Sequence, residues 1–212
     1  MQRLFILCLA MLAASCASTT DTSRERVETQ LPFKEVVQYR NVETFKGGVN
    51  CGEVNATGRW GDETGYLRYI VLKDREILRP TNDDWVVYCS DDPVAAVELQ
   101  FNIFPVDRSN TALLRVVSDL QMLDRALQAY LLADQRAYPS TKEGLAALSL
   151  ESTPIDPWGQ PYLYERVRVL HPLPPQYRLL TLGKDGQPGG SGDDADIGSW
   201  HLPYLEYALQ LY

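Results

Sequence analysis

Hydrophobic and polar positions change their period near the middle of this 212-residue chain. Between residues 33 and 106, short apolar runs alternate with polar positions and are separated by Gly, Asn and Asp, a pattern typical of strands and turns. It predicts five strands, at residues 36–45, 49–56, 65–72, 83–90 and 95–104. From residue 107 to 135, apolar residues recur every three or four positions, which predicts one long amphipathic helix.

The long helix is expected to pack on a sheet, because charged residues interrupt it too often for a membrane span. A partner-binding surface is the alternative. Ser109 or Asn110 can cap its first turn. Its apolar stripe consists of Leu113, Val116, Val117, Leu120, Leu123, Leu127, Tyr130 and Leu131.

The remaining elements complete an α+β prediction. Pro139 stops the helix, and the pattern then predicts a short helix at 141–148, strands at 162–169 and 176–182, and a closing helix at 201–212. We therefore expect a small β-rich domain at 33–106. A second domain at 107–212 should contain the long helix packed on an antiparallel meander.

The N-terminus has the features of an export signal. Arg3 supplies positive charge, residues 4–12 are apolar, and small residues precede Cys16. A bilayer crossing needs about 20 apolar residues, so this segment is too short to span. The sequence LAASC resembles the lipobox of bacterial lipoproteins, which implies removal of residues 1–15 and acylation of Cys16. An ordinary signal peptide that contains a cysteine is the alternative.

The lipoprotein resemblance also implies a location. Acylated Cys16 would attach the chain to a membrane, and residues 16–32 would form a flexible tether. In lipoproteins an aspartate directly after the cysteine favours the inner membrane. Here Ala17 follows, which implies an outer-membrane lipoprotein facing the periplasm or the cell surface.

Charge and cysteine content narrow the picture further. The chain has 28 acidic and 20 basic residues, a formal net charge of −8, which argues against nucleic acid as a partner. Once Cys8 and Cys16 are assigned to the signal and the lipid, Cys51 and Cys89 remain. In an exported chain they are most simply a disulfide, with a free buried pair as the alternative.

A glycine-rich acidic segment follows the last predicted strand. Asp185, Asp193, Asp194 and Asp196 lie close together in the sequence, with Lys184 as the one opposing charge. Five nearby glycines allow the backbone to turn its carbonyl oxygens inward, and carboxylate and carbonyl oxygens are the ligands that calcium prefers. The spacing is not that of an EF-hand, and a solvated acidic surface loop is the alternative reading.

Three ordered sequence boxes follow the long helix. The first, around YPSTKEGL, contains Tyr138, Pro139, Thr141, Gly144, Leu145 and Leu148. The second, DPWGQPYLY, contains Asp156, Pro157, Trp158, Gly159, Pro161, Tyr162 and Tyr164. The third contains Leu182, Gly183, Asp185, Gly186, Gly189, Gly190, Gly192, Ala195, Asp196, Ile197 and Trp200. In this order the boxes resemble the C-terminal domain of the major pseudopilins of type II secretion, with Gln160 in place of an asparagine.

The resemblance implies a calcium ion in the acidic loop. Asp185 would be the best carboxylate ligand and Leu182 the best carbonyl donor. Further carboxylates would come from Asp193, Asp194 and Asp196, with Asp194 and Asp196 favoured over Asp193. It also implies contact with secretion or pilus proteins. The pseudopilin start, a peptidase site leading into a continuous apolar helix, is not matched in this sequence, which puts filament assembly in doubt.

Catalysis is not expected. Neither His171 nor His201 belongs to a triad pattern, and both are expected in exposed loops. The sequence therefore favours a noncatalytic, calcium-binding envelope lipoprotein that contacts secretion or pilus machinery. The alternative is a ligand-binding or adhesion lipoprotein whose β-rich domain recognises the ligand through Trp60, Tyr66, Tyr69 and Trp85.

Overall fold

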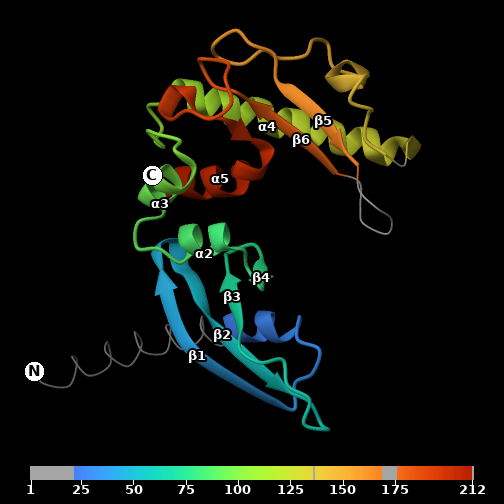
Figure 1. Ribbon diagram of the computed structural model, residues 1–212. Coiled ribbons are helices and arrows are strands. Elements are labelled where there is room, and N and C mark those ends of the chain that lie inside the picture. Colours follow the sequence, from blue (N-terminus) through green and yellow to red (C-terminus); the bar gives the residue numbers. More distant parts are fainter. Residues whose placement is uncertain (1–21, 136, 169–175, 212) are drawn as a thin grey trace, which may run out of the picture. The chain divides into compact units, whose positions relative to one another are not determined.

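The computed structural model describes residues 22–135, 137–168 and 176–211, and the chain divides into two compact units, Met1–Pro93 and Val94–Tyr212 (Figure 1). The predicted export signal, the lipobox-like sequence and Cys16 lie outside the described residues. The boundary falls earlier than the predicted one at 106. Residues 94–106 belong to the second unit, where the ring of Phe101 packs against His201 and Tyr204 at centroid distances of 4.7 and 5.1 Å.

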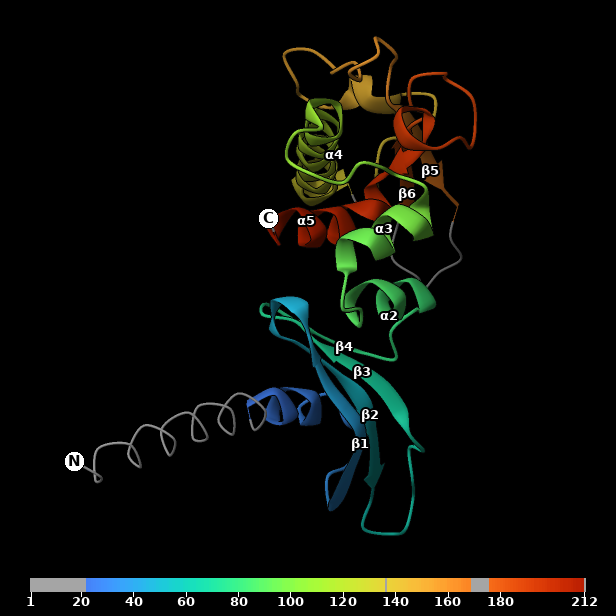
Figure 2. The ribbon, with the colours of Figure 1, turned by 90° about the vertical axis from the view of Figure 1, so that its left-hand side faces the viewer.

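The first unit contains a four-stranded antiparallel sheet in the order β1-β2-β3-β4 (Figures 1 and 2). Its strands are β1 (Val36–Phe45), β2 (Val49–Thr57), β3 (Leu67–Val71) and β4 (Glu76–Leu78). The first three coincide with predicted strands. A core of Val27, Leu31, Val54, Ala56, Tyr69 and Val71 lies on one face of the sheet.

Part of the expected tether, from residue 22 onward, is folded onto the sheet. Residues 22–28 are helical, and the side chains of Val27 and Leu31 are 2% and 6% exposed within the core. Arg26 holds this segment to the sheet by donating to a Glu76 carboxylate oxygen at 2.9 Å and to the Leu72 carbonyl oxygen at 2.8 Å. From residue 22 onward the tether assignment is therefore wrong, because this segment supplies apolar side chains that cover the sheet.

Two predicted strands are helices. The segments 83–90 and 95–104 form α2 (Asn82–Tyr88) and α3 (Pro93–Phe101). Thr81 and Asp84 form a reciprocal capping box, with Thr81 Oγ1 accepting from the Asp84 amide at 3.1 Å and the Asp84 carboxylate accepting from the Thr81 amide at 2.9 Å. Capping outweighs the strand preference of the paired valines in α2, and Pro93 suits the first turn of α3.

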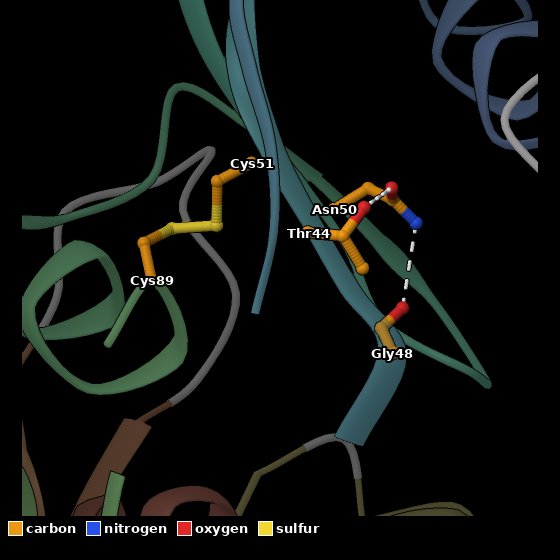
Figure 3. The surroundings of a disulfide bond; sticks show 5 residues. All are labelled: Thr44, Gly48, Asn50, Cys51 and Cys89. Carbon is orange, nitrogen blue, oxygen red and sulfur yellow. Dashed lines mark hydrogen bonds between the residues drawn. A yellow bond between two sulfur atoms is a disulfide. The ribbon is translucent and has the colours of Figure 1, made fainter. Parts of the chain in front are cut away.

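Cys51 and Cys89 form the predicted disulfide, which joins β2 to the residue that caps the end of α2 (Figure 3). Their Cα atoms are 6.0 Å apart, within the usual range for a bridge. Cys51 is 1% exposed. Neighbouring Asn50 accepts from Thr44 Oγ1 at 2.8 Å and donates to the Gly48 carbonyl oxygen at 3.3 Å, which fixes the β1–β2 turn.

The second unit is built on α4 (Thr111–Tyr130), as the apolar stripe predicts. The Asn110 side chain caps it by accepting from the Leu113 amide at 3.0 Å. The first six residues of the predicted stripe are buried. Helix α4 continues into a π-helical turn at Leu131–Gln135, and the predicted helix at 141–148 is a 3₁₀ turn at Gly144–Ala147.

Helix α4 contacts a three-stranded antiparallel sheet in the order β5-β6-β7 and the closing helix α5 (Leu202–Gln210) (Figures 1 and 2). The strands are β5 (Leu163–Val167), β6 (Gln176–Thr181) and β7 (Ile197–Gly198). Two tyrosine hydroxyls bond the sheet side to α4, Tyr162 to Asp119 at 3.0 Å and Tyr177 to Asp124. Within the described ranges, no helix has both the length and the apolar character needed to cross a bilayer.

Candidate functional site

The acidic segment forms a closed loop between β6 and β7. The Lys184 amide donates to the Asp193 carbonyl oxygen at 2.8 Å, and the Asp196 amide donates to that of Gly189 at 3.2 Å. Gly183 has a φ of +66°, and a Cβ there would lie 2.6 Å from the Asp194 carbonyl carbon. The loop thus needs glycine where its two arms meet.

Asp196 carries an unusual carboxylate. Its Oδ2 atom accepts from the Gly189 amide at 2.9 Å. Its Oδ1 atom is buried and has no hydrogen-bond partner within the described part of the chain. A buried polar atom without a partner is costly unless something satisfies it. A buried carboxylate oxygen without a protein donor is available to a hard cation, which prefers oxygen ligands.

The other candidate ligands differ in their surroundings. Asp185 is exposed, and its Oδ1 atom accepts from the Gln187 amide at 2.9 Å. Asp193 is exposed, whereas Asp194 and Leu182 are half-buried. In residues 22–135, 137–168 and 176–211, no group of three or more His, Cys, Asp or Glu side chains is gathered closely enough to hold a metal ion. A cation in this loop would therefore depend on backbone carbonyl oxygens as well as carboxylates.

The sequence assigned no role to the residues that support the loop from the neighbouring turn. Asp156 is 1% exposed and Thr181 is 1% exposed, and the Thr181 hydroxyl donates to Asp156 at 2.6 Å. Asp156 and Gln160 belong to the DPWGQPY box. The sequence identified that box as part of the family resemblance, but only the fold shows that it contacts the acidic loop.

His201 is not the exposed loop residue that the sequence predicts. It is 9% exposed, its Nε2 atom accepts from the Trp200 indole at 2.9 Å, and its Nδ1 atom lies 3.3 Å from the Gly198 amide nitrogen. It packs on Phe101 of α3, a contact that spans about a hundred residues of sequence and could not be read from it. His171 lies outside the described residues.

Burial changes the ionisation of the tyrosines that join sheet and helix. Desolvation and then the neighbouring Asp119 carboxylate raise the pKa of Tyr162. Desolvation and then the hydrogen bond to Asp124 raise the pKa of Tyr177. Burial raises the pKa of Tyr164 to about 12. These neutral phenols are structural groups and lie beside the helix.

The aromatic residues of the first unit separate into core and surface. Tyr69 is 2% exposed and belongs to the core. Trp60 is 85% exposed. The Arg40 guanidinium lies 3.7 Å from the centroid of the Tyr66 ring, and that of Arg68 lies 4.7 Å from the centroid of Trp85. Three of the four aromatic residues expected to contact a ligand are therefore at or near the surface. Tyr69 is buried in the core and cannot contact a ligand there.

Comparisons with known proteins agree on one family, and the match to its sequence model lies within the second unit. The sequence model of the family "Type II secretion system (T2SS), protein G" matches residues 149–200, which contain the acidic loop. The core protein G of type II secretion from Pseudomonas aeruginosa is 39% identical over 99 residues, covering 39% of this chain and 66% of that protein. The Vibrio cholerae protein of the same name is 36% identical over 108 residues, covering 42% of this chain and 68% of that protein.

A third relative, from Pectobacterium carotovorum, is 35% identical over 106 residues and has the same printed name. The chain spans about two thirds of the length of these relatives. These alignments are longer than the segment 149–200 that matches the family model.

Proposed function

Because this chain belongs to the type II secretion system protein G family, we propose that it is a calcium-binding envelope lipoprotein whose second unit contacts the secretion machinery. The family is a noncatalytic structural component of secretion, so its membership confirms that the chain is not an enzyme. The β-rich first unit, which contains the Cys51–Cys89 disulfide, would be a separate domain beside the pseudopilin-like unit in the sequence.

The buried Oδ1 atom of Asp196 is the observation that carries the calcium proposal. Calcium takes oxygen ligands from carboxylates and backbone carbonyls, which are the groups that the loop presents. Asp196 would hold the ion together with the Leu182 carbonyl oxygen, Asp185 and a carboxylate of Asp193 or Asp194. The ion would supply the positive charge that offsets the repulsion among these carboxylates and orders a glycine-rich loop.

Thermal unfolding tests the calcium proposal. At a calcium concentration 100 times the Kd, binding to the folded state alone adds about 2.7 kcal/mol to the free energy of unfolding. The melting temperature of the second unit should therefore rise with calcium and fall with chelator, and Asp196→Asn should abolish the difference. Asp91→Asn, which changes an exposed acid in the first unit, should leave it intact. If the melting temperature of the wild-type protein is the same with calcium and with chelator, the proposal is wrong.

Membrane attachment through Cys16 is the second part of the proposal. The LAASC sequence supports it, and Ala17 supports the outer membrane. Fractionation of cells that express the wild-type protein should place it with outer membranes, and detergent should release it. Cys16→Ser should yield a protein that is absent from that fraction. Retention of this variant in the membrane would rule out acylation as the anchor.

Contact with secretion or pilus proteins rests on family membership, since fold alone does not fix function. Affinity purification from solubilised envelopes should recover subunits of the secretion system. The matched control is a chain truncated after residue 93, which keeps the first unit and lacks the second. Recovery of no secretion or pilus subunit with the full chain would remove this part of the proposal.

The second candidate function is ligand binding or adhesion by the first unit. The 85% exposure of the Trp60 side chain favours it, because tryptophan is enriched in the contact surfaces of protein interfaces. In this case the pseudopilin-like unit would act as a scaffold. Adhesion or ligand binding that survives removal of residues 94–212 and is lost in Trp60→Ala would favour this candidate over the first.

A further inference from the structure

The DPWGQP turn contains a buried carboxylate that is fully engaged in shaping the chain. Asp156 Oδ1 accepts from the Trp158 amide at 3.0 Å and the Gln160 amide at 2.8 Å, which closes the turn. Asp156 Oδ2 accepts from the Thr181 hydroxyl at 2.6 Å. A side chain that is 1% exposed needs protein hydrogen bonds in place of water, and these three bonds supply them.

Thr181 carries this interaction into the acidic loop. It is the last residue of β6, and Leu182 follows it directly. Its hydroxyl donates to Asp156 and accepts from the Gly183 amide at 3.2 Å. The carbonyl of Leu182 belongs to the peptide group that ends in this amide. A fixed Gly183 amide therefore fixes the direction of the Leu182 carbonyl oxygen.

Gln160 contacts the residues that follow Leu182. Its side-chain amide donates to the carbonyl oxygens of Gly183 at 3.3 Å and Lys184 at 3.4 Å. A Cβ at Gly186 would collide with the Gln160 side-chain oxygen, which shows how closely the two segments approach. The two carbonyls that follow Leu182 are thus already bonded to Gln160, while the loop continues directly to Asp185.

We propose that Asp156, Thr181 and Gln160 are positioning residues that set the calcium affinity of the acidic loop by orienting the Leu182 carbonyl and the segment leading to Asp185. This inference rests on the calcium site proposed above. It assigns the DPWGQP turn a role in cation binding that its sequence does not reveal. Outer-layer hydrogen bonds of this kind change metal affinity because they fix the ligands before the ion arrives.

Two variants remove the bonds separately. Thr181→Val keeps the shape of the side chain and suits a strand but deletes the hydroxyl, and Gln160→Ala removes the amide from a half-buried position. Calcium titration calorimetry should show a Kd raised by about 10- to 100-fold in each. Thr181→Ser, which restores the hydroxyl, should return the Kd to within about threefold of the wild-type value.

Tyr164→Phe is the control for a merely structural effect. It deletes a hydroxyl that donates to the Pro139 carbonyl oxygen at 2.7 Å, away from the loop. It should lower the melting temperature in chelator and leave the Kd unchanged. A wild-type Kd in folded Thr181→Val or in Gln160→Ala overturns the inference, and Gln160→Ala decides alone if the first variant does not fold. A wild-type protein that binds no calcium instead overturns the proposed function.

Discussion

Removal of the disulfide should strongly destabilise the first unit. The change is the double substitution Cys51→Ala and Cys89→Ala, which leaves no unpaired thiol behind. The bridge connects β2 to the end of α2 across 38 residues of sequence. In the unfolded chain these two points are otherwise free to separate, so the bridge reduces the entropy that unfolding gains.

The size of the effect follows from the loop length. For a separation of 38 residues, the chain-entropy relation gives about 4 kcal/mol at 25 °C. Small domains have total stabilities of about 5–15 kcal/mol. The double variant should therefore lose a large fraction of the stability of the first unit, while the second unit, which contains neither cysteine, should keep its own.

Urea unfolding followed by fluorescence can separate the two units. Trp60 and Trp85 belong to the first, and Trp158 and Trp200 to the second. In a background with Trp158→Phe and Trp200→Phe, the fluorescence reports the first unit alone. The midpoint should fall in the double cysteine variant, and reductant should produce a similar fall in the parent protein.

The controls decide whether the bridge is the cause. Reductant should have no further effect on the double variant, and Val86→Ala, at a 43% exposed position of α2, should change stability by less than about 0.5 kcal/mol. A loss of under about 1 kcal/mol in the double variant would refute the entropic reasoning. Labelling of both cysteines in the unreduced native protein would refute the bridge itself.

Three further predictions concern individual elements. Val27→Ala should destabilise the first unit by about 2 kcal/mol in urea unfolding, because Val27 is 2% exposed, and an unchanged midpoint would show that residues 22–28 are not part of the core. Thr81→Ala should cost about 1 kcal/mol in the same assay through loss of the α2 cap, whereas Thr81→Ser should cost little; equal losses would contradict the capping role. The pKa values of Tyr162, Tyr164 and Tyr177 are raised on folding, so their contribution to stability is complete below pH 10 and is lost as the pH rises toward 12. Circular dichroism and phenolate absorbance should show the second unit unfolding in this window, and ionisation of all its tyrosines near pH 10 with the fold intact would oppose this prediction.

The sequence by itself predicted the elements whose pattern is local and strong. The stripe of α4 repeats over five turns, and the strands β1, β2 and β3 alternate between turn residues, so neither needs distant contacts to be recognised. The pairing of Cys51 with Cys89 was predicted by elimination, on the expectation that the chain is exported, and the structure confirms it. The family was visible because its three boxes keep their order along the chain.

Only the tertiary structure decided the rest, because it depends on what lies nearby in space. The valines of α2 are typical of a strand in the sequence, but the cap formed by Thr81 and Asp84 starts a helix there. Val27 was predicted to lie in a tether, but it is part of the core that covers the sheet. The sequence indicated the candidate cation loop through its content of Asp and Gly. It could not show that Asp196 Oδ1 is buried without a hydrogen-bond partner among the described residues. It also could not show that Thr181 bonds Asp156, because residues 25 positions apart meet only when β6 and the preceding turn fold together.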